Sequence, residues 1–319
     1  MSTPQYDIVI IGAGPAGLTA GLYASRGGMK TLLCEKMAPG GQAATTDVIE
    51  NYPGYPEGIS GPALMESIEN QARRFGAEIV TITEVTRIQV ENGFFTVETS
   101  GDAYSAKSVI VASGAEPKRL GVPGEGTFTG RGVSYCAVCD GAFFRDADIA
   151  VVGGGNAAVE EALYLTRYGK KIHLIHRRDR LRADKVLAER ALRDEKIEFL
   201  WDTVVDEIKG EGGVSELAIR NVKDGTESAL KVEGVFIYVG FQPNTLYLND
   251  LVDLDDNGFI LTAPDMATSI PGIFACGDVR SKDLRQVVTA AGDGSIAAFS
   301  AEKHIEKLEN REYGEFDAS

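Results

Sequence analysis

Cysteine, histidine and tryptophan are all scarce in this chain of 319 residues, which has four cysteines, three histidines and one tryptophan. Four cysteines are too few for the disulfide framework that holds small secreted domains together. A structural zinc site needs four suitably spaced ligands, and the histidines and cysteines are too scattered to supply them, so we expect no metal. The N-terminal residues lack the basic segment that opens a signal peptide, and we therefore expect a cytoplasmic protein.

Positive charge is also in short supply. Lys and Arg number 32 against 47 Asp and Glu, a formal net charge of −15. Such a surface repels phosphate backbones and anionic lipids, so we expect neither nucleic acid nor a membrane as partner. Residues 8–25 carry no charge, but four glycines and a proline interrupt them, which favours a strand, a turn and a helix over a membrane span. The composition is otherwise typical of a globular protein of about two domains.

Glycine, by contrast, is abundant at 37 residues, and the glycines recur in a pattern. Residues 7–36 and 148–177 superimpose at a constant offset of 141 residues. Each copy has the order strand, glycine turn, helix, strand of a βαβ unit, in which the glycines permit the turn, the approach of a pyrophosphate and close helix packing. These positions are Gly12, Gly14 and Gly17 in the first copy and Gly153, Gly155 and Ala158 in the second. The repeat predicts two dinucleotide-binding sites.

The two copies differ at the end of the second strand, where the chain meets the ribose of a bound dinucleotide. The first copy has Glu35, whose carboxylate suits the free 2′-hydroxyl of FAD or NAD. The second has His176 followed by Arg177 and Arg178, and residues 170–185 hold seven Lys or Arg against two Asp. Clustered arginine suits the 2′-phosphate of NADP. The alternative interpretation is a solvated basic helix face.

Strand-like alternation predicts the domain organisation. Residues 78–111 contain short alternating runs that we expect to form an antiparallel layer returning to the sheet, and residues 197–240 repeat this pattern. The stretch after residue 245 has no glycine fingerprint, so we expect it to complete the first domain. The fold class expected is α/β, with two Rossmann-like, three-layer ββα domains, one inserted in the other. Their expected bounds are residues 1–117 and 247–319 for the first domain and residues 118–246 for the second.

One further motif, Cys136-Ala137-Val138-Cys139, stands just before the second glycine fingerprint. Two cysteines at this spacing form a small-ring disulfide that opens and closes, and the pair gains reactivity when one thiol has a lowered pKa. Asp140 follows directly and is a candidate proton donor or acceptor. The alternative is half of a zinc site, although no second cysteine pair completes it. Cys34 and Cys276 lie in apolar runs, and we expect them to be packed, inert thiols.

Taken in order, these motifs closely resemble those of the low-molecular-weight bacterial-type thioredoxin reductases, essentially from end to end. The resemblance is carried by residues 12–17, 40–42, 136–141, 153–158, 176–179 with Arg182, 277–279 and 285–287. It implies an enzyme that passes electrons from NADPH through FAD and the Cys136/Cys139 disulfide to thioredoxin or a thioredoxin-like protein. It also implies a homodimer whose smaller, NADPH-binding domain swings between two arrangements.

The resemblance further assigns residues to each role. FAD would contact Gly12, Gly14, Pro15, Ala16, Gly17, Glu35, Lys36, Gly40, Gly41, Gln42, Asn51, Asp278, Val279, Arg285, Gln286 and Val287. NADPH would contact Gly153, Gly155, Asn156, Ala157, Ala158, His176, Arg177, Arg178 and Arg182. Cys139 would lie nearer the flavin, Cys136 would attack the partner disulfide, and Asp140 would protonate the leaving thiolate. The sequence departs from the family at Ala142, where an aromatic residue often helps to contact thioredoxin.

Three other interpretations share parts of this pattern. A ferredoxin– or flavodoxin–NADP reductase has the same folds but lacks the cysteine pair. The flavoprotein of alkyl hydroperoxide reductase has the pair but carries a thioredoxin-like region ahead of it, whereas here the first strand is expected to begin by Tyr6. A non-enzymatic nucleotide sensor would retain both glycine fingerprints but would have no use for the cysteine pair.

Overall fold

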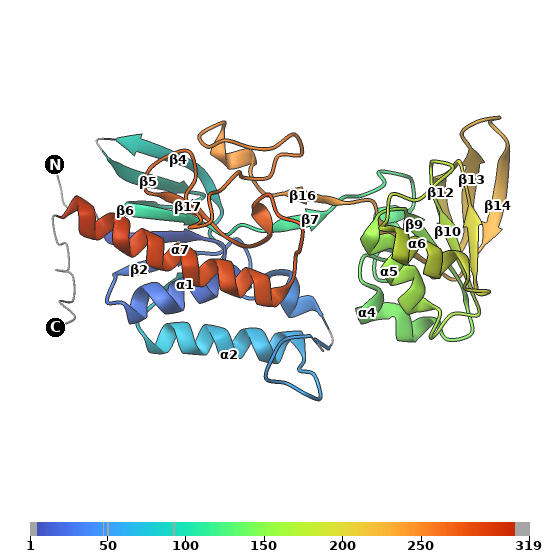
Figure 1. Cartoon of the computed structure of the whole chain (residues 1–319), viewed down its shortest axis with the longest axis horizontal. Helices are drawn as coiled ribbons and strands as arrows, with labels where there is room; N and C mark the ends of the chain where they lie inside the picture. Colours follow the sequence, from blue (N-terminus) through green and yellow to red (C-terminus); the bar gives the residue numbers. More distant parts are fainter. Residues whose placement is uncertain (1–4, 47, 50, 92, 310–319) are drawn as a thin grey trace. The chain divides into compact units, whose positions relative to one another are not determined.

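The computed structural model describes residues 5–46, 48–49, 51–91 and 93–309, without the side chains of residues 138 and 139. The chain divides into two compact units, one made of Met1–Glu116 and Gln242–Ser319 and the other of Pro117–Phe241. It passes from one to the other through β7 (Ala115–Pro117) and β16 (Phe241–Pro243), which pair with each other (Figure 1). The second unit is therefore an insertion in the first.

The first unit is built on a seven-stranded sheet. Its strands are β1 (Tyr6–Ile11), β2 (Thr31–Cys34), β3 (Glu78–Val80), β4 (Val85–Glu91), β5 (Phe94–Thr99), β6 (Ala103–Val111) and β17 (Ile273–Ala275). The order is β3-β2-β1-β6-β5-β4, with β17 also paired to β6. Strands β3, β2, β1, β6 and β17 are parallel, whereas β4 and β5 run antiparallel to their neighbours.

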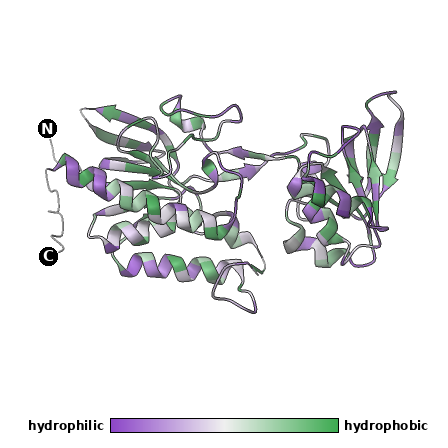
Figure 2. Ribbon diagram, viewed as in Figure 1, coloured by the Kyte–Doolittle hydropathy of each residue, from purple (hydrophilic) through white to green (hydrophobic). Residues whose placement is uncertain are grey.

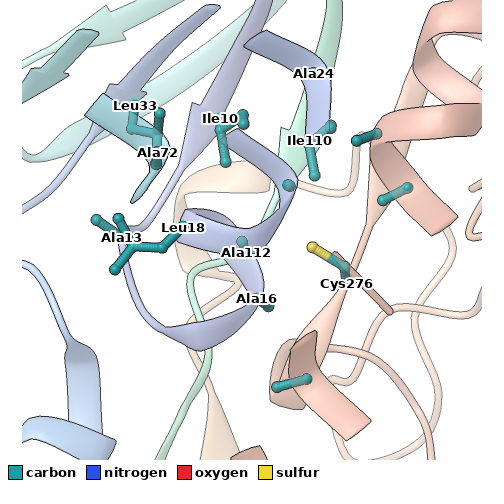
Figure 3. Packing of buried hydrophobic residues seen from close by; sticks show 14 of the residues in the cluster. Ile10, Ala13, Ala16, Leu18, Ala24, Leu33, Ala72, Ile110, Ala112 and Cys276 are labelled. Carbon is teal, nitrogen blue, oxygen red and sulfur yellow. The ribbon is translucent and has the colours of Figure 1, made fainter. Parts of the chain in front are cut away.

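Helices pack on one face of the parallel strands. The β4–β5 hairpin, which extends the same sheet beyond β6, packs its side chains with those on the other face. The helical elements are α1 (Pro15–Arg26), η1 (Gly41–Thr45), α2 (Gly61–Arg74), η3 (Leu246–Leu248), η4 (Gly277–Val279) and α7 (Val287–Leu308). Alternate residues of β1 pack on opposite faces of the sheet, in two different hydrophobic clusters. Ile8 and Ile10 join the cluster that includes Leu18 of α1, part of which Figure 3 shows, while Val9 and Ile11 join the cluster with Phe95 of β5.

The expected antiparallel direction was wrong for one strand in each unit. In the second unit, residues 197–200 pair in parallel with residues 172–175. Residues 78–82 were expected in the antiparallel layer, but β3 pairs in parallel with β2, from Leu32 with Glu78 to Cys34 with Val80. A three-residue strand has too little alternation to reveal its direction, and its place is decided by the helix α2 that precedes it. A helix between two strands is the usual crossover to a parallel neighbour.

The second unit repeats the plan with a five-stranded parallel sheet in the order β11-β10-β9-β15-β8 and a three-stranded antiparallel sheet, β12-β13-β14. The strands are β8 (Val133–Ser134), β9 (Asp148–Gly153), β10 (Lys171–Ile175), β11 (Ile197–Leu200), β12 (Thr203–Gly210), β13 (Val214–Asn221), β14 (Glu227–Lys231) and β15 (Gly234–Tyr238). The helices are α3 (Glu125–Phe128), α4 (Ala137–Asp140), η2 (Gly141–Phe144), α5 (Asn156–Leu165) and α6 (Lys185–Leu192).

Alternation along β9 again separates two buried layers. Ile149 and Val151 pack with α5, whereas Ala150 and Val152 pack with Leu217 and its neighbours in the antiparallel sheet. The strands of both parallel sheets are largely hydrophobic, while the helices alternate hydrophobic and hydrophilic positions (Figure 2). Each unit thus has helices, a parallel sheet and an antiparallel layer, and the predicted fold class is confirmed.

Candidate active site

The first glycine fingerprint forms the turn between β1 and α1. Gly12 has a φ of 101°, and a Cβ added there would lie 2.5 Å from the carbonyl oxygen of Ala112, so only glycine fits. Helix α1 begins after Gly14 without a side-chain cap and has Pro15 in its first turn. The backbone N–H groups in the first turn of α1 therefore have no capping side chain, which is the arrangement that receives a pyrophosphate.

Glu35, at the end of β2, is held against this turn by two backbone donors. Its Oε2 accepts the N–H of Ala13 at 2.8 Å, and its Oε1 accepts the N–H of Met37 at 2.9 Å. Each carboxylate oxygen can accept more than one hydrogen bond, so both retain capacity for hydroxyl donors. The carboxylate is thus fixed in orientation beside the glycine turn while remaining able to bind a ribose.

Segments remote in sequence converge on the same turn. Gly40 N–H donates to the Ala13 carbonyl at 2.7 Å, and a Cβ added to Gly41 would lie 3.2 Å from the Cα of Gly14. From the other end of the chain, a Cβ on Gly277 would lie 2.7 Å from the Cβ of Ala16. The start of η1 and the start of η4 therefore both lie against the beginning of α1.

Two polar side chains in this region each have one buried atom without a hydrogen bond from any described residue. These atoms are Oδ1 of Asp278 and Nε of Arg285, whose guanidinium group lies over the Phe259 ring, 4.2 Å from its centre. Burial raises the pKa of Asp278, because the charged carboxylate is poorly solvated. An orphaned buried carboxylate is costly unless a donor reaches it. The hydroxyl groups of a ribityl chain are such donors, so the residues present fit FAD.

The other residues assigned to FAD are placed as follows. Asn51 donates from Nδ2 to Oε1 of Gln286 at 2.9 Å, which joins the loop after η1 to the N-cap of α7. Gln42 donates from Nε2 to the carbonyl of Ala115. Lys36 instead forms an exposed ion pair with Glu84 at 2.8 Å. Val279 is buried and Val287 is half-buried at the first turn of α7.

The second fingerprint lies at the start of α5, which begins after Gly155 and has no side-chain cap. Asn156, the first residue of α5, exchanges two hydrogen bonds with Asp184, at 2.8 Å and 2.7 Å. Arg182 N–H donates to the Gly154 carbonyl at 2.7 Å. The arginine-bearing loop after β10 is therefore tied to the glycine turn at two points. Ala157 is exposed and Ala158 is buried in the α5 packing.

His176 and the arginines take different positions at this edge. His176 is buried, its ring centroid is 6.5 Å from that of Trp201, and its Nε2 has no partner among the described residues. Burial, followed by the charges of Arg182 and Arg178, lowers the pKa of His176. Arg177, Arg178 and Arg182 are exposed, and none of the salt bridges among the described residues involves them. Three guanidinium groups are thus available to an anion, which fits a 2′-phosphate.

The cysteine motif occupies the turn between β8 and α4 in the second unit. Cys136 is disulfide-bonded and half-buried, whereas the side chain of Cys139 lies outside the described part of the structure. The Asp140 N–H donates to the Cys136 carbonyl at 3.1 Å, closing the turn. A cysteine held in a disulfide is in its oxidised form, so the structure holds this turn in that form.

Two hydroxyl groups at this turn were not anticipated from the sequence. Oγ of Ser134 lies 2.5 Å from Oδ2 of Asp140 and accepts the Cys136 N–H at 3.1 Å. The Tyr238 hydroxyl accepts the Ala137 N–H at 2.6 Å. Ser134 stands two residues before Cys136, which was a signal available in the sequence. Tyr238 stands about 100 residues away, and only the parallel pairing of β15 with β8 brings it to the turn.

Aromatic residues after the turn are divided between surface and core. Phe143 is 82% exposed, whereas Phe144 packs edge-to-face on Phe236 with ring centroids 5.4 Å apart. The two remaining cysteines are buried thiols, and burial raises the pKa of Cys34 to about 12 and that of Cys276 further still. Such thiols stay protonated and unreactive.

The described residues include neither a metal-binding cluster nor a membrane-spanning helix. No group of three or more His, Cys, Asp or Glu side chains there is arranged to hold a metal ion. None of the helices in that part of the chain combines the length and apolarity needed to cross a bilayer.

Comparisons with known proteins agree over nearly the whole chain. Residues 6–294 match the family model described as pyridine nucleotide-disulphide oxidoreductase. The chain is 49% identical over 304 residues to a thioredoxin reductase of Listeria monocytogenes, covering 95% of each, and 48% identical over 305 residues to one of Bacillus subtilis, covering 95% and 96%. Its structure is similar to that of Lactococcus lactis thioredoxin reductase, with a TM-score of 0.80 and 48% identity over 95% of this chain and 100% of that one.

Proposed function

This chain belongs to the pyridine nucleotide-disulphide oxidoreductase family and, within it, to the thioredoxin reductases; from that premise we propose how its residues divide the work. The enzyme oxidises NADPH and reduces the disulfide of thioredoxin: NADPH, one proton and thioredoxin disulfide give NADP⁺ and thioredoxin dithiol. The observation that carries the proposal is the disulfide of Cys136, in a turn beside a carboxylic acid and in the unit that holds the arginine cluster.

The first unit is proposed to hold FAD and the second NADPH. When bound, FAD supplies the means of turning a hydride from NADPH into an electron pair for a disulfide. The chain's own contribution is to bind and orient. Glu35 accepts the ribose hydroxyls, Asp278 accepts ribityl hydroxyls, and the first turn of α1 meets the pyrophosphate. In the second unit the first turn of α5 meets the NADPH pyrophosphate, and Arg177, Arg178 and Arg182 bind the 2′-phosphate.

The two cysteines are proposed to react in a fixed order. Once the Cys136–Cys139 disulfide has received two electrons, the Cys136 thiolate attacks one sulfur of the thioredoxin disulfide, and the other sulfur leaves as a thiolate. Cys139 then attacks the mixed disulfide, which re-forms the internal disulfide and releases the second thioredoxin thiolate. Asp140 supplies a proton to a leaving thiolate, so that it departs as a thiol. A ferredoxin–NADP reductase lacks the cysteine pair and has no counterpart to these steps.

Thioredoxin itself is the proposed partner, and Phe143 is the proposed anchor. This side chain is 82% exposed and only four residues from the cysteine motif. Exposed aromatic side chains of this kind are common anchors at protein interfaces. We further propose a cytoplasmic location, because thiols are kept reduced there and NADPH is available.

The proposal predicts that the purified protein carries about one FAD per chain and oxidises NADPH in the presence of oxidised thioredoxin. Flavin released by heat and separated by chromatography measures the first, and the loss of NADPH absorbance measures the second. Omitting thioredoxin is the control. The rate of NADPH oxidation should then fall to that of the slow reaction with oxygen. A colourless protein that takes up no FAD, or a rate independent of thioredoxin, would show the proposal to be wrong.

A homodimer is proposed through the exposed face of α7 and α1. Val288, Ile296 and Phe299 follow one stripe of α7 and are 40%, 41% and 59% exposed, and Tyr23 of the adjacent α1 is 48% exposed. The two helices touch closely, since a Cβ on Gly294 of α7 would lie 2.2 Å from a carbonyl of α1. An apolar stripe along a solvent-facing helix is typical of a covered interface.

Phe299→Asp is therefore expected to convert a dimer of twice the 34.1 kDa chain mass into a monomer. A charge placed in an apolar interface loses its hydration without gaining a partner. Light scattering after size exclusion measures the mass. Val186→Asp is the matched control, because Val186 is 80% exposed on α6 of the other unit and should leave the mass unchanged. A wild-type protein that runs as a monomer would contradict the proposal.

A further inference from the structure

Both backbone N–H groups next to the Cys136 side chain are engaged by hydroxyl oxygens. Ser134, the last residue of β8, accepts the Cys136 N–H, and Tyr238, the last residue of β15, accepts the Ala137 N–H. Backbone donors at the start of a helical turn usually favour a neighbouring thiolate. Here the N–H groups of Cys136 and Ala137 already donate to neutral hydroxyl oxygens. The chemistry of the cysteine therefore depends more on the side chains around the turn.

Only one of these hydroxyls also reaches the acid. Ser134 Oγ is 2.5 Å from Asp140 Oδ2 and 3.3 Å from the Cys136 carbonyl. A hydroxyl has a single proton, and bonds of about 2.5–2.7 Å are those in which a hydroxyl donates to a charged carboxylate. The proton therefore goes to Asp140 rather than to the carbonyl. Ser134 is 4% exposed, so water does not compete readily for this bond.

We propose that Ser134 is a positioning residue for Asp140: its hydroxyl fixes the orientation of the carboxyl group beside the Cys136 turn, so that the carboxyl proton can reach a leaving thiolate. The inference rests on the proposed role of Asp140 as proton donor. In that step a thiolate released from a broken disulfide takes the carboxyl proton and becomes a thiol, and the carboxyl becomes a carboxylate. No electrons move beyond the pair already transferred in breaking the S–S bond.

Losing this hydroxyl leaves the carboxyl group able to turn away from the Cys136 turn. Proton transfer to the leaving thiolate should then slow. The NADPH half of the reaction uses neither Ser134 nor Asp140 and should continue. A hydrogen bond to a charged group is strong enough to change the rate by about tenfold.

Other titratable groups face this turn and have to be separated from Asp140. Tyr238 lies on β15 and interacts electrostatically with both Asp140 and Glu161 of α5. Burial, and then the charge of Glu160, raises the pKa of Glu161 to about 7, which falls within the assay range. Glu161→Gln removes the carboxylate on α5 and leaves the Ser134–Asp140 bond in place.

The test compares Ser134→Ala with Ser134→Thr, which keeps the hydroxyl, and Tyr238→Phe, which removes the other hydroxyl from the same turn. Each FAD-loaded variant is assayed from about pH 5.5 to 9 for thioredoxin reduction, alone and with Glu161→Gln, and kcat is separated from the KM for thioredoxin. A second readout needs no thioredoxin: stopped-flow bleaching of the flavin by NADPH follows the half-reaction that uses neither residue. Ser134→Gly serves if the alanine variant does not fold.

We expect Ser134→Ala to lower kcat for thioredoxin reduction by about tenfold, with little change in the KM for thioredoxin or in the bleaching of the flavin by NADPH. Ser134→Thr and Tyr238→Phe should keep the wild-type kcat. A wild-type kcat in Ser134→Ala, with Asp140→Asn still slow, would overturn the positioning role and leave the role of Asp140 standing. Wild-type turnover in Asp140→Asn would overturn the role of Asp140 itself.

Discussion

Replacing Cys136 by serine is expected to lower thioredoxin reduction by a factor on the order of 10³ or more, while NADPH still reduces the flavin. A serine hydroxyl is almost entirely protonated at neutral pH and cannot exchange with a disulfide, whereas a thiolate can. The hydride half of the reaction uses neither cysteine, so it continues. Stopped-flow bleaching of the flavin by NADPH and a thioredoxin assay on the same preparation measure the two halves separately.

Cys139→Ser should also lose turnover, but with a different product. It retains the attacking Cys136 and lacks the thiol that would resolve the mixed disulfide. With a thioredoxin that lacks its own resolving cysteine, a covalent complex should therefore accumulate, and non-reducing electrophoresis detects it. Cys136→Ser should form none. These contrasting results would assign the two cysteines their order even though both variants are inactive.

Cys34→Ala is the control for the loss of a thiol as such. Cys34 is 2% exposed in β2, and its raised pKa, about 12, keeps it protonated. The Cys34→Ala variant should reduce thioredoxin at close to the wild-type rate. If Cys136→Ser or Cys139→Ser also did so, the pair would not be the electron relay, and a reductase that passes electrons directly from the flavin would be the better interpretation.

Local sequence was sufficient for the features that depend on local geometry. The two glycine turns and the alternation of β9 are decided by neighbouring residues, and the layered α/β fold followed from them. The direction of β3 was not predictable, because three residues pair equally well either way and α2 decides between the two. Glu35 was singled out because a strand end after a glycine turn is a fixed position in a βαβ unit.

Residues brought in by long-range packing were beyond local sequence patterns. Tyr238 reaches the cysteine turn only because β15 lies between β8 and β9 in the sheet. Asp278 could be assigned to FAD by resemblance, but its motif does not reveal that Oδ1 is buried without a partner. Lys36 illustrates the opposite case, since it follows Glu35 in sequence yet pairs with Glu84 at the surface. The side chains of neighbouring residues at the end of a strand point in different directions.

Neutralising the arginine pair, as Arg177→Gln with Arg178→Gln, is expected to raise the KM for NADPH at least about tenfold and to leave that for NADH nearly unchanged. The two coenzymes differ only in the 2′-phosphate, so a selective loss identifies the group that the arginines bind. A charge-assisted hydrogen bond contributes roughly 1.5–3 kcal/mol, and the lower end applies here because both side chains are exposed. One such contact at the lower end already accounts for about a tenfold change.

A general loss of positive charge has to be distinguished from the loss of a specific contact. Arg190 and Arg193 are exposed at the C-terminal end of α6 in the same unit, and Arg193 pairs with Glu189 at 3.7 Å. Replacing both by glutamine removes two positive charges from the same unit. Exposed charges that make no contact with the ligand add little to binding in 0.1 M salt, where the screening length is about 10 Å. Steady-state kinetics with both coenzymes should therefore show the loss of NADPH preference only in the Arg177/Arg178 variant. Equal losses in the two double variants would mean that long-range attraction, rather than a phosphate site after β10, selects NADPH.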